Sequence, residues 1–249
     1  MTALDTERAT AMAAAAGGVA KRGYVKQMFS DIAPRYDRVN RIISFRLDEW
    51  WRGKAVRALD VSRHPTGAYL DLCAGTLDVA SRIESRSGFR GTVIAADFAE
   101  PMLRAGLAKA SPAVVRPVAA DALDLPFADG FADGAIVVFG IRNVVDLDRA
   151  LREVHRVLRP RGRFVILEFG VTQHPLVGWI YRLYFNHLCP IVGNAVARHH
   201  SAYNYLPESV AHFPSETELA WRMREAGFGA VSWRSYTFGV VAMHVGEKQ

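Results

Sequence analysis

Three acidic side chains stand at the ends of three successive apolar runs that are typical of β-strands. Asp71 lies near the end of "AYLDLC", Asp97 ends "GTVIAAD", and Asp121 follows "VVRPVAA". A carboxylate at the second of these places can accept hydrogen bonds from both ribose hydroxyls of a nucleoside. Asp121 and the backbone N–H that follows it can meet the edge of an adenine ring. One such acid is often only a helix cap, but three in succession favour a nucleoside site.

The loop after the first of these runs is poor in glycine. Loops that hold nucleotides usually carry glycine at alternate positions, but here only Gly75 remains, and Cys73 and Leu77 occupy the other two places. A pyrophosphate needs close approach of the backbone at more than one point, so a nicotinamide dinucleotide is disfavoured. S-adenosylmethionine (SAM) has no phosphate, and nearby carboxylates favour its cationic sulfonium. The sequence therefore favours SAM as the cofactor.

Strand-like and helix-like segments alternate through the middle of the chain, which predicts the elements that position these acids. Strict alternation implies a parallel sheet covered on both faces, with ligands beyond the carboxyl ends of its strands. Near the C-terminus, a helix capped at Ser215 leads to two strands that turn at Phe238, which predicts a hairpin. The five predicted strands before this hairpin are "AYLDLC", "GTVIAAD", "VVRPVAA", "DGAIVVFG" and "GRFVILEFG".

The domain organisation predicted from these patterns is simple. Residues 1–22 lack the basic start of a signal peptide and are expected to form a mobile N-terminal arm. Residues 23–249 are expected to form a single α/β domain, with a helical cap at 23–66. An aromatic-rich insertion at about 174–210 interrupts the alternation. Placed at the carboxyl edge of the sheet, it would act as a lid over the ligand.

Composition limits the possible partners. The 249 residues are 50% hydrophobic and 22% charged, as in a globular protein with a sizeable core. Two cysteines are too few for a disulfide framework, which favours a reducing cytoplasm, and no Cys/His spacing indicates a metal. The net charge of +6 comes without a nucleic-acid module, so we expect no nucleic-acid partner. The basic stretch 38–63 is either a solvated face or a surface attracted to lipid phosphates.

Seven segments resemble the quinone-biosynthesis C-methyltransferases, the family that methylates demethylmenaquinol and its counterpart in the ubiquinone pathway. They run from Val25 to Gly246, and "FGIRNV" and "YLPES" are the most specific. The resemblance implies the seven-stranded class I SAM-dependent methyltransferase fold, with the last strand antiparallel. The segments are "MFSDIAPRYDRVNRIISF", "LDLCAGTLDVA", "ADFAEPML", "ADALDLPF", "FGIRNVVDLDRALREVHRVLRPRGRFVILEF", "YNYLPESVAHFP" and "GVVAMHVG".

The resemblance also implies which residues hold the cofactor. Three positions, Leu77, Arg161 and Phe238, carry side chains where this family usually has glycine, and Leu77 is expected to crowd the methionine end of SAM or to change the backbone. A contact at Val138 would come from its backbone alone. The cofactor-binding candidates are Asp71, Gly75, Thr76, Asp78, Asp97, Asp121, Ala122 and Val138.

Methylation of a quinol ring carbon requires that a hydroxyl proton leave and that the developing phenolate be stabilised. We expect Arg142 to stabilise the phenolate and Asn143 to orient the ring oxygen; the alternative for Arg142 is an ion pair with an acid such as Glu208. Arginine hardly deprotonates, so it is a poor base. The candidates from the cap and lid that could line the site, stack on the ring or relay a proton are Tyr36, Asp37, His187, Tyr203 and Tyr205.

The expected function is SAM-dependent C-methylation of a prenylated quinol, with demethylmenaquinol as the first choice. Two alternatives remain open: a methyltransferase for another small aromatic metabolite, and a non-catalytic SAM-binding subunit of a quinone-synthesis complex. Because the isoprenoid tail lies in lipid, we expect a cytoplasmic protein at the inner face of the membrane, with "PLVGWIYRLYFNHLCPIVG" at the interface. A homodimer is left open.

Overall fold

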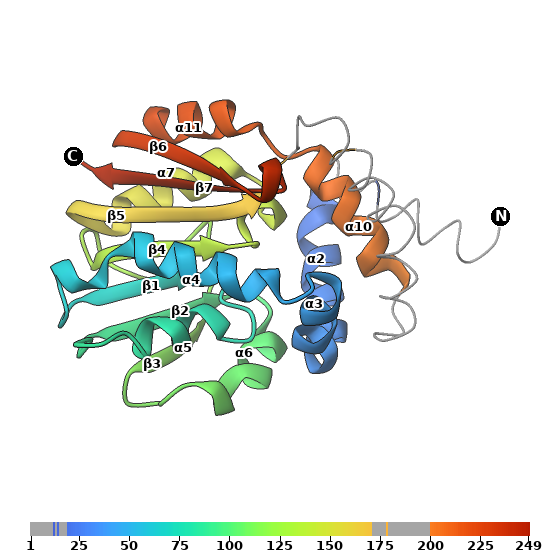
Figure 1. The fold of residues 1–249 in the computed structure, drawn as a ribbon, viewed down its shortest axis with the longest axis horizontal. Coiled ribbons are helices and arrows are strands. Elements are labelled where there is room, and N and C mark those ends of the chain that lie inside the picture. Colours follow the sequence, from blue (N-terminus) through green and yellow to red (C-terminus); the bar gives the residue numbers. More distant parts are fainter. Residues whose placement is uncertain (1–11, 13, 15–18, 171–177, 179–199) are drawn as a thin grey trace.

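The computed structural model describes residues 12, 14, 19–170, 178 and 200–249 (Figure 1). Its centre is a seven-stranded sheet in the order β3-β2-β1-β4-β5-β7-β6. Strands β1 to β5 are parallel, and β7 runs antiparallel to both β5 and β6. The strands are β1 (Ala68–Leu72), β2 (Thr92–Asp97), β3 (Val115–Ala119), β4 (Ala132–Val138), β5 (Leu158–Phe169), β6 (Phe228–Tyr236) and β7 (Val241–Lys248).

Helices cover both faces of the sheet, because its central strands are apolar on both sides. Successive residues of β1 enter different cores: Tyr69 packs with α4 (Leu47–Leu59) and α5 (Asp78–Glu84), and Leu70 packs with α7 (Leu147–Val157) and α11 (Glu216–Glu225). Helix α6 (Glu100–Gly106) joins the α4–α5 side through Leu103. Figure 1 shows α4 crossing the front of the sheet.

The remaining helices form a layer across the carboxyl edge of the sheet. Figure 1 shows α2 (Val19–Ile32), α3 (Tyr36–Ile43) and α10 (His200–Ala211) stacked beyond the tips of the parallel strands. The rings of Tyr24 and Tyr205, with centroids 5.7 Å apart, join α2 to α10. Short 3-10 turns complete the description: η1 (Ala33–Arg35), η2 (Val61–Arg63), η3 (Leu107–Lys109), η4 (Ile141–Asn143) and η6 (Thr237–Gly239).

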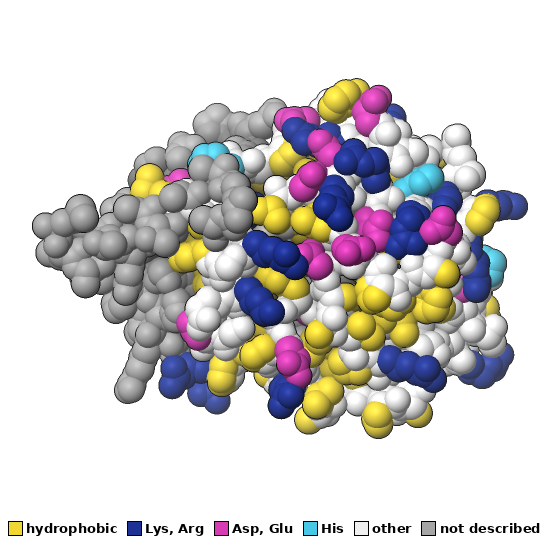
Figure 2. Space-filling view, turned by 180° about the vertical axis from the view of Figure 1, so that it is seen from behind, with side chains coloured by type: hydrophobic (Ala, Val, Ile, Leu, Met, Phe, Trp, Pro, Cys, Tyr) yellow, Lys and Arg dark blue, Asp and Glu magenta, His cyan; other side chains and the backbone are white. Residues whose placement is uncertain are grey.

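The face opposite α4 carries charges of both signs. Figure 2 shows Lys and Arg side chains interleaved with Asp and Glu over α7 and α11. On α11, Arg222 pairs with Glu218 at 2.6 Å and with Asp148 of α7 at 3.1 Å. The positive net charge is therefore not gathered into one patch on this face. Among the residues that the structure describes, no helix is long and apolar enough to cross a bilayer.

The predicted fold is confirmed. The alternating segments form a parallel sheet, the last strand is antiparallel, and the C-terminal pair is a hairpin whose turn contains Phe238 and Gly239. Helix α11 begins after Ser215, whose hydroxyl accepts the N–H of Glu218, as its sequence predicted. Helix α2 begins at Val19, within the segment predicted as an arm. The boundaries of that arm and of the lid stay predictions, because much of both lies outside the described residues.

Candidate functional site

A pocket opens at the carboxyl edge, beyond the ends of β1, β2, β3 and β4. It encloses about 470 Å³ of space between its lining atoms, part of which is open to solvent. Four of the predicted site residues line it: Asp97, Asp121, Ala122 and Asn143. The other lining residues are Arg22, Leu72, Cys73, Ala96, Phe98, Ala120, Gly140, Val144 and Val145.

The loop between β1 and α5 keeps the backbone of a glycine-rich loop, although only one of the three positions concerned is glycine. Cys73, Gly75 and Leu77 have φ values of 52°, 52° and 64°, all in the left-handed region. The Leu77 side chain is only 1% exposed and packs in the core beneath the loop rather than lining the pocket. Gly106 leaves it room, because a Cβ there would lie 2.8 Å from Leu77 Cγ. Leu77 therefore raises the free-energy cost of the left-handed backbone more than it changes the shape of the pocket.

Asp97 is held in place before any ligand arrives. Its Oδ2 accepts the Gly75 N–H at 2.9 Å, and its Oδ1 accepts the Ala99 N–H at 2.8 Å. Burial raises the pKa of Asp97, and these backbone donors oppose that rise. Each carboxylate oxygen has lone pairs beyond those used here. The side chain therefore remains able to accept the two hydroxyls of a ribose, so this part of the pocket fits SAM.

Asp121 joins the pocket floor to the helical layer above it. Its Oδ1 accepts the Leu123 N–H at 3.0 Å, and its Oδ2 pairs with Arg22 of α2 at 2.7 Å. Arg22 and Ala122 line the same pocket. Asp121, which was predicted to meet the adenine edge, therefore also connects α2 to the pocket through its ion pair with Arg22.

Asp71 lies away from the pocket lining. It sits within β1 between Ala95 and Ile136, is 1% exposed, and has one oxygen without a partner. Burial raises the pKa of this carboxyl well above its ordinary value. Asp71 does not line the pocket, so its predicted role in binding the cofactor stays a prediction.

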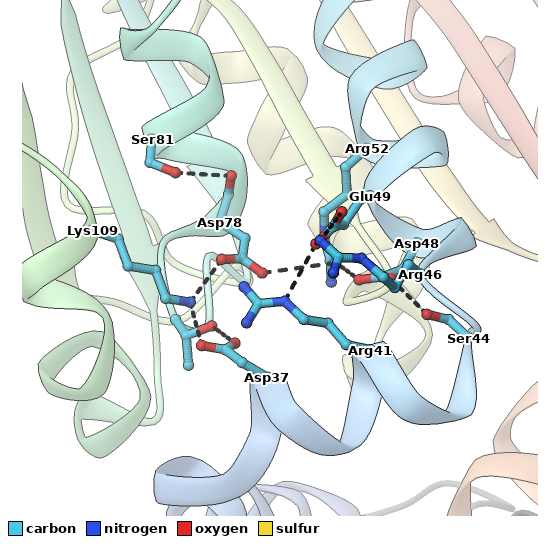
Figure 3. Close-up of polar contacts among 11 residues, drawn as sticks. Asp37, Arg41, Ser44, Arg46, Asp48, Glu49, Arg52, Asp78, Ser81 and Lys109 are labelled. Atoms are coloured by element: carbon cyan, nitrogen blue, oxygen red, sulfur yellow. Dashed lines mark hydrogen bonds and ion pairs between the residues drawn. The ribbon is translucent and has the colours of Figure 1, made fainter.

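A charged network connects α3 to the loop after β1 (Figure 3). The Thr76 hydroxyl donates to the Asp37 carboxylate. The Lys109 ammonium pairs with Asp37 and, at 2.7 Å, with Asp78. Thr76, Asp37 and Asp78 thus meet each other beside the pocket, rather than lining it.

The same network reaches α4. Arg52 is nearly buried, pairs with Asp48, and approaches Asp78 to 3.8 Å. Burial alone would raise the pKa of Asp78, but the hydrogen bond from Lys109 and the charge of Arg52 hold it below its ordinary value. Asp78 is therefore a charged anchor for the helical layer.

Arg142 is buried in an ion pair, and its partner is Glu168 at the end of β5. Arg142 Nη1 lies 3.1 Å and 2.9 Å from the two carboxylate oxygens of Glu168 and donates to the Phe139 carbonyl at 2.6 Å. The guanidinium also lies over the Phe169 ring, 5.4 Å from its centroid. Burial alone would lower the pKa of Arg142, but Glu168 raises it, so the group stays charged.

Three buried polar atoms around η4 have no hydrogen-bond partner: Arg142 Nε, Asn143 Oδ1 and the Tyr205 hydroxyl. Tyr205 comes from α10, which contacts η4, and is 2% exposed. Burial raises the pKa of Tyr205 to about 12, and the Arg142 charge opposes that rise. Buried polar groups are rarely left unpaired, so each of these atoms calls for an additional partner. Arg142 and Asn143 are neighbours in η4, and Tyr205 is close enough for the Arg142 charge to act on its pKa. The three atoms therefore form a cluster of two donors and one acceptor in one region, of which only Asn143 lines the pocket.

The other candidates lie in several places. Tyr36 packs edge-on against Phe29, and burial raises its pKa. Val138 ends β4, is 8% exposed and does not line the pocket. Tyr203 belongs to α10, but its side chain lies outside the described part of the structure, and so does all of His187.

Sequence reasoning missed Lys21, Arg22 and Glu168. Lys21 Nζ donates to the Arg142 carbonyl at 2.9 Å, and burial, followed by the Arg142 charge, lowers the pKa of Lys21. The two basic residues fell in the segment predicted as an arm. Glu168 gave one usable signal: it is the single acid in the apolar run "FVILEF", where an unpaired charge would be costly.

The comparisons with known proteins agree with this geometry. Residues 18–248 match the ubiE/COQ5 methyltransferase family. This chain belongs to that family. It is a SAM-dependent C-methyltransferase, and the pocket residues above fit that cofactor. A demethylmenaquinone methyltransferase of Thermus thermophilus is 44% identical over 223 residues, which cover 89% of this chain and 100% of that protein.

Other relatives support the same assignment. The ubiquinone/menaquinone biosynthesis C-methyltransferase UbiE of Geotalea daltonii is 38% identical over 228 residues, covering 90% of this chain and 96% of that protein. Among solved structures, a SAM-dependent methyltransferase of Thermotoga maritima, described as a possible histamine N-methyltransferase, aligns with a TM-score of 0.63. At 21% identity, covering 90% of this chain and 99% of that one, it shows the fold alone.

Proposed function

We propose that this enzyme methylates a ring carbon of a prenylated quinol and that demethylmenaquinol is its substrate. The relatives of Thermus thermophilus and Geotalea daltonii carry names for this reaction and align along nearly their whole length. The observation that carries the proposal is the cluster of unpartnered atoms from Arg142, Asn143 and Tyr205 beside the pocket. A quinol oxygen is the kind of group that such a cluster would bind.

The proposed site would have a cofactor half at the pocket and an acceptor half around η4. SAM supplies an electrophilic methyl group on a sulfonium. Asp97 would accept the ribose hydroxyls, and Asp121 with Ala122 would border the adenine. Gly75 and Thr76 would leave room for the methionine end, with Thr76 oriented by Asp37. These contacts would fix the cofactor so that its methyl faces the ring carbon in line, which lowers the entropic part of the barrier.

The acceptor half would stabilise negative charge on the ring. Arg142 stays protonated, and its Nε–H has no partner, so it can donate to a phenolate oxygen. The Tyr205 hydroxyl can donate to the same oxygen, and the Asn143 carbonyl oxygen can accept the remaining ring hydroxyl. Tyr205 also belongs to the layer that shields this charge from water, which strengthens each of these hydrogen bonds.

A prenylated substrate also suggests where the enzyme works. We infer that it acts from the cytoplasm on quinols embedded in the inner face of a membrane, because the isoprenoid tail partitions into lipid and only the ring can enter the pocket. What supports this inference is the chemistry of the proposed substrate: lipid holds the tail, so the enzyme would meet the ring at the membrane surface.

An in vitro methylation assay tests the proposal. Purified enzyme is incubated with SAM and chemically reduced demethylmenaquinone, and the product is identified by mass spectrometry. We expect methylated quinol from the wild type and a loss of kcat of about 100-fold or more in Arg142→Ala. SAM affinity, measured by calorimetry, should change little in this variant, and the surface variant Arg104→Ala is the control.

The outcomes separate the alternatives. Full turnover by Arg142→Ala would remove the proposed role of that residue. Methylation of tail-less phenols but not of the prenylated quinol would indicate another aromatic metabolite as the substrate. SAM binding with no methylation of either would indicate a non-catalytic subunit.

A further inference from the structure

Two aromatic side chains lie exposed at the tips of turns where glycine would be the ordinary residue. Phe45 joins α3 to α4 and is 73% exposed, and Phe238 lies in η6 and is 74% exposed. Their φ values are 50° and 56°, in the left-handed region that costs a residue with a side chain roughly 1–2 kcal/mol. The chain thus retains two phenylalanines that add both backbone strain and exposed apolar area. Strained residues held against such costs point to a function.

The two turns belong to one surface, which we call the shoulder. The start of α4 connects them, because Trp50 contacts Tyr236 with ring centroids 5.6 Å apart, and Trp51 Nε1 donates to Thr237 Oγ1 at 3.0 Å. Further large apolar side chains of α3 and α4 are exposed beside Phe45. The apolar residues of the shoulder are Ile42 (46% exposed), Phe45, Leu47 (41%), Trp50 (47%) and Phe238.

Positive charge surrounds these apolar side chains. Arg38, Arg41 and Arg46 are exposed, and Lys54 lies over the Trp50 ring, 5.3 Å from its centroid. The acids of this stretch do little to offset that charge. Asp48 is buried against Arg52, and Glu49 is shared between Arg41 and Arg46. The charges of this region contrast with the interleaved signs on the opposite face in Figure 2.

The shoulder also lies at the edge of the sheet that holds the pocket. Trp51 and Arg52 pack against Phe139, which directly follows β4. Strand β7 begins next to η6 and pairs there with Phe169, the last residue of β5. Both turns therefore lie toward the carboxyl edge of the sheet, the edge at which the pocket opens.

We propose that the shoulder docks on the surface of an anionic lipid bilayer, with Phe45 and Phe238 inserted among the acyl chains. Aromatic tips flanked by arginine and lysine suit the membrane interface, where the rings enter lipid and the cations meet headgroup phosphates. This proposal rests on the proposed function only for the reason why docking would be needed. The exposure, the backbone strain and the charge of the shoulder are the same whether or not the substrate is a quinol. The positive charges of the shoulder would suit either a bilayer or an acidic protein. The apolar tips, which project from separate turns, favour the bilayer.

Substitution by glycine tests the proposal with two effects of opposite sign. Phe45→Gly and Phe238→Gly relieve the left-handed strain, so each should raise Tm by about 2–4 °C. Each should also lower partitioning to vesicles about tenfold, because a buried phenylalanine ring is lost from lipid. Arg161→Gly is the matched control: Arg161 also has a positive φ and is exposed, and its replacement should raise Tm without changing vesicle binding.

Two charge-reversal variants, one in the shoulder and one outside it, give a second controlled test. Arg46→Glu should weaken binding about thirtyfold, since each unit of charge near an anionic surface is worth about fivefold. Arg104→Glu should leave binding unchanged. The two arginines have side chains that are 72% and 73% exposed, and each pairs with a nearby glutamate. Arg46 directly precedes α4 in the shoulder, whereas Arg104 lies on α6.

The measurement is co-sedimentation with extruded vesicles of phosphatidylcholine, with and without 30% phosphatidylglycerol (about one lipid in three), in the absence of SAM and quinol. We expect the wild type to bind only the anionic vesicles and to be released by high salt. Because no turnover is measured, failure here is distinct from failure of the proposed reaction. Three results would overturn the proposal: no binding by the wild type, unchanged binding by both glycine variants, or a dimer in analytical ultracentrifugation that those variants dissociate.

Discussion

At the scale of single residues, the clearest feature is the set of side chains placed where the backbone prefers glycine. Leu77, Arg161 and Phe238 were identified from the sequence as departures from the usual glycine of the family, and all three have φ between 56° and 66°. The backbone geometry has thus been kept while the residue has changed. Leu77 recovers part of its cost by burial, whereas Arg161 is exposed and recovers none.

Arg161→Gly should therefore stabilise the protein. Relief of a left-handed backbone conformation is worth about 1–2 kcal/mol, and the greater freedom of glycine in the unfolded chain offsets part of this. We expect a gain of about 0.5–1 kcal/mol in the free energy of unfolding, measured by urea denaturation. Arg159→Gly, two residues earlier on the same strand, should destabilise. A loss of stability in Arg161→Gly would mean that its side chain makes a contact that outweighs the strain.

Glu168 fixes the orientation of the Arg142 guanidinium. The carboxylate and the Phe139 carbonyl both engage Nη1, and Nε is left without a partner. Glu168 does not line the pocket, so we assign it a positioning role rather than a catalytic one.

Glu168→Gln should lower kcat more than it changes the KM for SAM, because the amide keeps the shape of the carboxylate but not its charge. It should also cost about 3–5 kcal/mol of stability, since it leaves Arg142 as a buried charge without a counter-charge. Steady-state kinetics and denaturation measure the two effects. Partial recovery in Glu168→Asp is expected; equal loss of kcat in both variants, with no change in stability, would contradict a positioning role.

At the scale of elements, the helical layer is joined to the cofactor loop by charges more than by apolar packing. Lys109 bridges Asp37 of α3 and Asp78 of α5, and Arg52 links α4 to the same Asp78. The Thr76 hydroxyl, bonded to Asp37, places a loop residue in this network. Movement of α3 would therefore be felt directly by the loop that is proposed to hold SAM.

A double-mutant cycle measures this coupling. Asp37→Asn and Lys109→Met should each weaken SAM binding, and together they should lose less than the sum, with a coupling of about 1 kcal/mol that shrinks in high salt. Calorimetry at two ionic strengths gives the values. Strictly additive losses would show that the network does not connect α3 to the loop.

The contact between β7 and α11 predicts a pH dependence. His244 is 2% exposed, its Nε2 bonds the Glu216 carbonyl, and burial lowers the pKa of His244. In the unfolded chain His244 binds a proton below about pH 6.5, whereas in the folded protein it binds one only at lower pH. The free energy of unfolding therefore falls as the pH drops through this window. His244→Phe should lose less stability than the wild type between pH 7 and pH 5, by thermal denaturation. An identical pH profile would contradict this assignment.

At the scale of the whole molecule, the fold was predictable and the finer contacts of the site were not. Alternating apolar runs and helical spacing depend on local sequence, and they predicted the parallel strands and the C-terminal hairpin. The acids Asp97 and Asp121 were found because parallel strands end at one edge. The pairing of Arg142 with Glu168, and of Arg22 with Asp121, joins segments far apart in the chain. Such pairs depend on side-chain directions that no local pattern encodes.

The proposed reaction requires that the pocket beyond the strand ends hold SAM by its ribose and base. A crystal structure with S-adenosylhomocysteine tests it most directly. We predict that both ribose hydroxyls lie about 3 Å from the Asp97 carboxylate, with adenine beside Asp121 and Ala122. A nucleoside bound elsewhere, or Asp97 turned away from the ribose while keeping its bonds to Gly75 and Ala99, would contradict it.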